Sequence, residues 1–122
     1  MDIFQNLVII QGRMVSAPDY VTTPNGTEGV KFFLGVERIT ADGKRVTDAF
    51  HVSAFGEKAG TVHRLCRKGT EMLVRGQLRP LPYSAGADVL ADEIKVAYTT
   101  PASGNAYARE PEQQEKIDIA ED

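Results

Sequence analysis

The histidine and cysteine residues are the first candidates for chemistry, because imidazole and thiolate groups bind metals and act as bases or nucleophiles. His63 and Cys66 are three residues apart, at helical spacing, while His51 stands on a separate predicted strand. A zinc site needs several such ligands at matched spacing, and a cysteine nucleophile needs a base that a third group orients. We therefore predict no catalytic residue, no metal and no cofactor. Cys66 is interpreted as a small core residue, and His51 as a polar strand residue or an interface contact.

Aromatic residues on the polar side of alternating segments indicate binding instead. Counting by two, Phe33 and Phe55 point away from their apolar neighbours, and Tyr83 shares the phase of Arg79. Aromatic rings beside cations suit a single nucleic-acid strand, because bases stack on the rings while cations follow the phosphates. An equally good interpretation is that Phe33 and Phe55 fill a dimer interface or cap the end of a barrel.

The elements that carry these residues follow from the hydrophobic period and from turn residues. Five alternating segments predict strands, and apolar residues at helical spacing after Gly56 predict one helix, with Arg67 and Lys68 in its last turn and Gly69 past its end. Phe50 is expected to face the core. The predicted strands are 3–11, 30–39, 45–55, 72–79 and 89–98, with a bend at Gly12-Arg13.

Five strands with one helix between the third and the fourth is the order of an OB-fold, a partly open Greek-key barrel. We therefore predict an all-β protein with a five-stranded OB-fold Greek-key barrel at 1–100. A disordered acidic C-terminal tail is expected at 101–122, where Pro, Ser, Gly, Gln and Glu dominate.

Charge is divided unevenly along the chain. Residues 1–100 carry 12 Lys and Arg against 11 Asp and Glu, whereas residues 101–122 carry two against six. The acidity belongs to the tail, so the body can present a local basic face. The lone cysteine, the lack of an apolar run of about 18–20 residues, and an N-terminus unlike a signal peptide predict a cytoplasmic protein outside the membrane.

The chain resembles the bacterial single-stranded DNA-binding protein family over about residues 6–98. The segments that carry the resemblance are NLVIIQGR from Asn6, TPNGT from Thr23, VKFFLGV from Val30, Phe55-Gly56, Arg67-Lys68-Gly69 and GQLR from Gly76. This resemblance implies an OB-fold that oligomerises, usually as a tetramer, and binds single-stranded DNA without sequence preference. It also implies a role in replication, recombination and repair.

Site residues follow from the resemblance and from strand phase together. Phe55 and Tyr83 match stacking positions of the family, the second usually a Trp, and Phe33 is added by phase. Phosphate contacts are expected from Arg13, Arg38, Lys44, Arg45, Lys68 and Arg79. The chain departs from the family in having no Trp, Thr40 and Ala49 at two further stacking positions, and Glu57 after Phe55-Gly56.

The tail resembles that of the family in being acidic, but it ends without the usual Pro-Phe pair. Two functions are open for it: docking to replication and repair proteins, or a solubilising tail that competes with DNA. The residues that would bind partners are Ile117, Asp118, Ile119, Glu121 and Asp122.

The sequence thus predicts a non-enzymatic protein that binds and protects single-stranded DNA as a homo-oligomer, with a tetramer favoured over a dimer. The alternative is an OB-fold adaptor of the primosome type that mainly binds proteins and touches DNA weakly. A binder of oligosaccharide or RNA would share the fold but has no further support.

Overall fold

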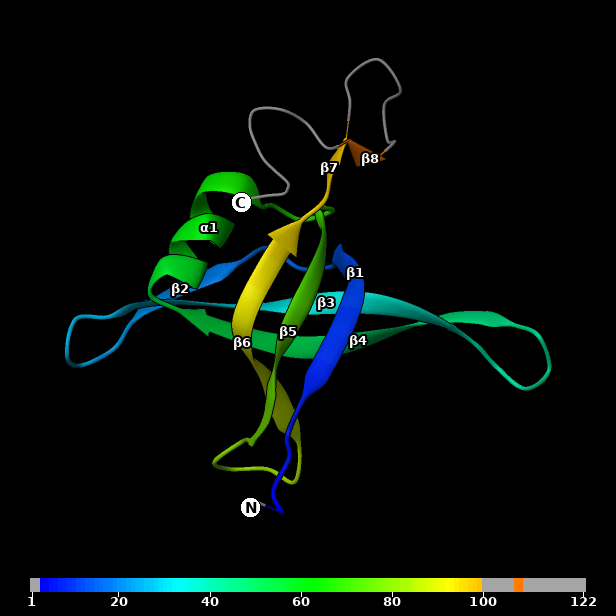
Figure 1. Cartoon of the computed structure of the whole chain (residues 1–122), viewed down its shortest axis with the longest axis horizontal. Coiled ribbons are helices and arrows are strands. Elements are labelled where there is room, and N and C mark those ends of the chain that lie inside the picture. The colour runs from blue at the N-terminus through cyan, green and yellow to red at the C-terminus, as the bar shows by residue number, and fades with distance from the viewer. Residues whose placement is uncertain (1–2, 100–106, 109–122) are drawn as a thin grey trace.

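The computed structural model describes residues 3–99 and 107–108, and its main body is one six-stranded sheet with one short helix packed against it. The sheet order is β1-β5-β6-β4-β3-β2, and β1 also pairs with β3, which closes five strands into a barrel (Figure 1). This is the predicted OB-fold barrel, with its helix between the third and fourth barrel strands. The elements are β1 Val8–Met14, β2 Asp19–Thr22, β3 Glu28–Ile39, β4 Arg45–Phe55, α1 Glu57–Leu65, β5 Glu71–Pro80, β6 Ala87–Val96, β7 Tyr98–Thr99 and β8 Tyr107–Ala108.

Two hairpins project from opposite sides of the barrel (Figure 1). The β3–β4 pairing runs from Gly29 opposite Phe55 to Ile39 opposite Arg45, which makes a long arm. Its turn uses Gly43 at φ 86°, and the β2–β3 turn uses Gly26 at φ 90°. Side chains with a Cβ rarely adopt these angles, so both predicted turns depend on glycine.

The core lies inside the barrel, and α1 covers part of it. Val62 and Ala59 of α1 are almost fully buried, at 0% and 3% exposure, so the helix contributes a narrow apolar face. Cys66 packs against this cluster as a half-buried residue, as predicted. The buried residues are Met14, Val30, Phe32, Leu34, Val52, Ala54, Ala59, Val62, Met72, Val74, Val89, Ala91, Ile94 and Val96.

The helix is shorter than the sequence predicts. It ends at Leu65, because Cys66 takes an extended conformation while its backbone N–H still donates to Val62. Arg67 and Lys68 therefore lie in the following turn, and the prediction that they occupy the last helical turn was wrong. Gly69 does follow the helix at φ 98°, and its N–H donates to the Met14 carbonyl at 2.8 Å.

The first strands also differ from expectation. β1 begins at Val8 rather than at Ile3, and it passes through Gly12 as one strand that pairs with β5 and, from Arg13, also with β3. The segment before it is held by Asn6, whose side-chain amide exchanges two 2.8 Å hydrogen bonds with the Leu78 backbone. The short strand β2 was not predicted, and it pairs only with β3.

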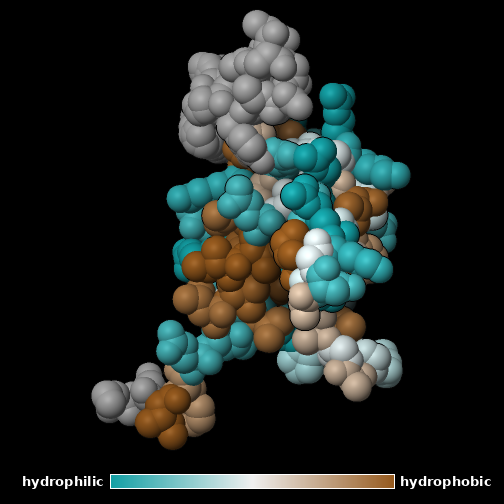
Figure 2. Space-filling model, turned by 90° about the vertical axis from the view of Figure 1, so that its right-hand side faces the viewer, coloured by the Kyte–Doolittle hydropathy of each residue, from teal (hydrophilic) through white to brown (hydrophobic). Residues whose placement is uncertain are grey.

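Phe50 is not a core residue, although its phase matches Val52 and Ala54. Its side chain is 41% exposed. On β4 the pairing with β6 begins only at Val52, two residues after Phe50, so the Phe50 ring is covered only in part. On the side from which the arm projects, the surface carries an apolar patch (Figure 2).

The C-terminal region is only partly described. β7 pairs with β8 through Tyr98 opposite Ala108, so a short strand lies inside the segment predicted to be a disordered tail. The other residues of 101–122 lie outside the described part of the chain, and the domain boundary at 100 stays a prediction. Among the described residues, no helix has the length and apolar character needed to cross a membrane.

Candidate nucleic-acid interface

The outer face of β3 and β4 carries the two predicted strand aromatics. Phe55 lies opposite Gly29 in the β3–β4 register, and Phe33 lies opposite His51. A Cβ added to Gly29 would lie 2.6 Å from the Phe55 ring, so the ring sits directly over the bare glycine backbone. Phe33 is 43% exposed, while the neighbouring Phe32 is buried. The Phe33 ring is therefore exposed on the outside of the barrel, while Phe55 is half-buried.

Arg79 joins Phe55 to the adjacent strands. Its guanidinium carbon lies 5.8 Å from the centre of the Phe55 ring, within cation–π range. Two of its N–H groups donate to Asp88, from Nε to Oδ1 at 3.2 Å and from Nη2 to Oδ2 at 3.0 Å. This bidentate contact follows from β5–β6 pairing, which places Arg79 directly opposite Asp88.

Asp88 also connects Arg79 to the second aromatic. The Ser53 hydroxyl donates to Asp88 Oδ2 at 2.7 Å, and His51 Nδ1 lies 3.6 Å from the same oxygen. The His51 ring in turn meets the Phe33 ring edge-on, with centroids 5.2 Å apart. A continuous set of contacts thus runs from Phe55 through Arg79, Asp88 and His51 to Phe33; we call these five side chains the aromatic–Arg79 surface.

The charge state of Asp88 is set by competing effects. Burial is the largest and raises the pKa of this carboxyl, which is only 1% exposed. Hydrogen bonds from Arg79 and Ser53, with the nearby positive charge of Arg79 and a coulombic contribution from His51, outweigh it, so the pKa is lowered. Asp88 is therefore an anion that remains charged although it is buried.

Two loops border this surface. Tyr83 lies in the β5–β6 loop beyond Pro80, with its ring 97% exposed, rather than in the phase of a strand. The loop is closed by a hydrogen bond from the Leu81 N–H to the Gly86 carbonyl at 3.0 Å. On the other side, the β2–β3 turn forms an open groove with Phe55, lined by Thr23, Pro24, Asn25, Thr27 and Phe55.

Lys31 is a surface cation that sequence reasoning missed. It shares the outer phase of β3 with Gly29 and Phe33, lies opposite Ser53 on β4, and is exposed. It therefore stands between the Phe55 and Phe33 positions. Among the described residues no carboxylate forms an ion pair with it. Its spacing of two residues from Phe33 places it in the same strand phase, and this signal was present in the sequence.

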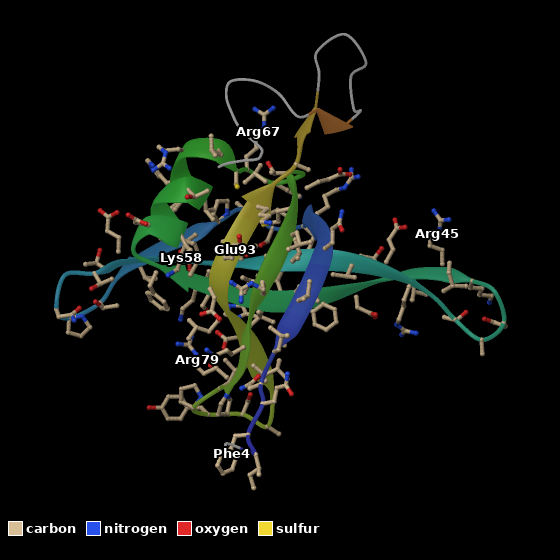
Figure 3. All side chains as sticks on the ribbon, in the orientation of Figure 1. Phe4, Arg45, Lys58, Arg67, Arg79 and Glu93 are labelled. Atoms are coloured by element: carbon tan, nitrogen blue, oxygen red, sulfur yellow. The ribbon has the colours of Figure 1, made fainter. Side chains whose placement is uncertain are left out.

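The other predicted cations are spread over the molecule, and Figure 3 labels one of them, Arg45, far from Arg79. Arg45 lies at the far end of the β3–β4 arm, and Arg38 and Lys44 are on the same arm. Lys68 precedes β5, whereas Arg79 is near its end, and the strand from Glu71 to Arg79 alone spans roughly 26 Å at the usual rise per residue. Arg13 lies where β1 meets β3, opposite Gly35.

Most of these arginines are already paired with carboxylates. Arg38 contacts Asp48 at 2.5 Å, and Arg45 lies 3.6 Å from Glu37. Arg13 is paired with Glu71. The structure thus brings Phe33, Phe55 and Arg79 together with Tyr83 on a bordering loop, and leaves the remaining predicted cations elsewhere.

Two other predictions concern metals and the tail. Within the described part of the chain, no three His, Cys, Asp or Glu side chains gather closely enough to hold a metal ion. The predicted partner-binding residues of the tail, Ile117 to Asp122, lie outside the described residues.

The fold and this surface define an OB-fold barrel with aromatic and cationic side chains on its β3–β4 face, and the comparisons place it in a family. The model of the single-strand binding protein family matches residues 5–89, which is more than half of the chain. The chain belongs to this family.

Proteins similar to this chain are named single-stranded DNA-binding proteins. Single-stranded DNA-binding protein 1 of Staphylococcus aureus (strain COL) is 28% identical over 95% of this chain and 74% of its own. Single-stranded DNA-binding protein 2 of that strain is 30% identical over 82% of this chain and 77% of its own. The crystal structure of the small single-stranded DNA-binding protein from Streptomyces coelicolor shares the fold, with a TM-score of 0.64 and 22% identity over 76% of this chain and 93% of that chain.

Proposed function

We propose that this protein binds single-stranded DNA without sequence preference and protects it. The observation that carries the proposal is the aromatic–Arg79 surface, in which the Phe55 and Phe33 rings of the β3–β4 face are linked through Arg79, Asp88 and His51. In OB-folds this is the face that binds oligonucleotides. The names of the related proteins support the same ligand.

Stacking and phosphate contacts would act together. Bases would stack on Phe55, Phe33 and the exposed ring of Tyr83, and any base can do so because each has a π-face. Arg79 and Lys31 lie beside these rings, where they would contact the phosphates between stacked bases. Arg13, Arg38, Lys44, Arg45 and Lys68 would add contacts only if the strand follows a long path around the barrel and the arm.

The wider role is part of the same proposal. We place the protein in replication, recombination and repair in the cytoplasm, as a homo-oligomer in which a tetramer is favoured over a dimer. The exposed apolar residues Ile9 and Phe50, at 57% and 41% exposure, support self-association through strand faces. The acidic tail would contact replication and repair proteins through Ile117, Asp118, Ile119, Glu121 and Asp122.

An adaptor that mainly binds proteins is the second candidate. The ion pairs of Arg13, Arg38 and Arg45 favour it, because arginines held by carboxylates attract phosphates less. The near-neutral charge of residues 1–100 also favours the adaptor, because it weakens the attraction of phosphates.

One titration separates the two functions. Binding of the full chain to labelled dT oligomers, duplex DNA and RNA is measured by fluorescence anisotropy at two salt concentrations. Single-strand binding predicts a strong preference for dT and an affinity that falls with salt, with a log–log slope of about −0.7 per phosphate neutralised. Equal, weak binding to all three would contradict single-strand binding and favour the adaptor.

A further inference from the structure

Asp88 is the one side chain through which Arg79, Ser53 and His51 are connected, although they come from two different strands. It is the second residue of β6 and lies beside β4 as well, because β6 pairs with β5 on one side and with β4 on the other. Its side chain is 1% exposed, so it cannot itself contact a bound strand. Any effect of Asp88 on nucleic-acid binding must therefore pass through a neighbour.

Arg79 is the neighbour best suited to transmit such an effect. A guanidinium has five N–H donors in a rigid plane, and Asp88 accepts from two of its nitrogens, Nε and Nη2. The bidentate contact fixes that plane, and the remaining donors stay available because the Arg79 side chain is 41% exposed. The guanidinium carbon lies over the Phe55 ring, 5.8 Å from its centre, so a strand that stacks at this ring would pass within reach of the free donors.

We infer that Asp88 is a positioning residue for nucleic-acid binding: it holds the Arg79 guanidinium beside Phe55 with its free donors toward the phosphate of a strand stacked there. The inference rests on the proposed function, which supplies the strand. It gives a buried anion a favourable role in binding a polyanion. Without Asp88, Arg79 keeps its charge but must be ordered each time a strand binds.

Simple electrostatics predicts the opposite sign, which makes the inference testable. Changing Asp88→Asn removes a negative charge beside the binding face, so charge alone would strengthen the attraction of DNA. If Asp88 positions Arg79, the same change weakens binding in spite of the added attraction. The matched control is Asp92→Asn, an equal charge change at an exposed residue of the same strand.

The experiment measures binding of the full chain to a dT oligomer at fixed salt, with circular dichroism to check the fold. We expect Asp88→Asn to weaken binding about 2- to 12-fold, as for the loss of order in one long side chain. Asp92→Asn should bind as the parent or slightly more tightly. In an Arg79→Gln background, Asp88→Asn should weaken binding no further, whereas the weakening from a general structural role would persist there.

A second variant covers the case in which Asp88→Asn does not fold. Arg79→Lys keeps the charge and a partner for Asp88 but lacks the planar fork, so it should bind more weakly than the parent, as Asp88→Asn does. If Arg79→Lys binds like the parent, or Asp88→Asn binds at least as tightly as Asp92→Asn, the inference is overturned. If the parent itself does not prefer the dT oligomer, the proposed function fails instead, and the two failures are distinct.

Discussion

The ring of Phe55 lies over Gly29 on the neighbouring strand, at a distance that leaves no space for a side chain there. The nearest ring carbon would be 2.6 Å from a Cβ at Gly29. A position without a side chain on β3 therefore determines where an aromatic ring of β4 can lie. This relationship lets the stacking role of Phe55 be tested without changing Phe55 itself.

We expect Gly29→Ala to weaken dT binding as much as Phe55→Ala does, on the order of 1–3 kcal/mol. The added methyl would displace the ring, while Phe55→Ala removes it. Because both act on the same ring, the double variant should be no weaker than either single one, and Phe55→Tyr should bind like the parent. Additive losses would show that Gly29→Ala acts through something other than this ring. Normal binding by Gly29→Ala would show that the ring position does not matter.

Tyr83 offers a test with little effect on stability. Since its ring is 97% exposed, Tyr83→Ala should leave the melting temperature unchanged. Loss of one stacking ring should weaken dT binding by about 1–3 kcal/mol. The matched control, Tyr83→Phe, retains the ring and should restore the affinity. If the Ala variant binds as tightly as the Phe variant, no base stacks on Tyr83.

Lys31 should dominate the salt dependence more than the paired arginines do. Lys31→Gln removes a cation that stands between the two rings, so the log–log salt slope should become shallower by about 0.7. Lys95→Gln, on β6 and paired with Glu93 at 3.8 Å, is the control and should leave the slope unchanged. Salt titrations of dT binding measure both slopes. Equal slopes for parent and Lys31→Gln would exclude a phosphate contact.

Acid should weaken the contribution of Asp88 to stability. Its pKa is lowered in the folded state, so its stabilising effect is complete above the usual Asp pKa of about 3.9 and is lost as the pH falls through the folded value. We expect Asp88→Asn to be less stable than the parent at about pH 7, and the gap to narrow below about pH 4. Urea unfolding of both proteins across that pH range measures the difference in their unfolding free energies. A difference independent of pH would contradict the lowered pKa.

Alternation and turn residues were sufficient to predict the barrel. β4 has the predicted bounds, and glycines at 26, 43 and 69 adopt the positive φ that their positions required. β2 was missed because its four residues carry little apolar pattern and depend on pairing with β3. Phe50 was misplaced for a similar reason: phase gives the face of a strand, but only the tertiary structure shows whether that face is covered.

The candidate surface could be predicted only in part. Strand phase placed Phe33 and Phe55 outside, since this needs no knowledge of neighbours. The Arg79–Asp88 contact depends on the β5–β6 register, which shifts between Arg75 and Gly76. No local pattern contains that shift, and the link to His51 requires a third strand. The sequence likewise does not show which cations form ion pairs with carboxylates and which are left to bind phosphates.

The junction of β1 with β3 has a consequence for how the molecule opens. Arg13 and Met14 pair across it, the Val15 N–H donates to the Phe33 carbonyl at 2.9 Å, and Gly12 is needed there because a Cβ would lie 2.0 Å from the Gly35 carbonyl oxygen. With so few bonds, this junction should separate before the eleven-residue pairing of β3 with β4 does. Amide hydrogens there should exchange with solvent before those of the β3–β4 pairing. Phe33, His51 and Phe55 of the aromatic–Arg79 surface lie in that longer pairing, so they should keep their places when the β1–β3 junction opens.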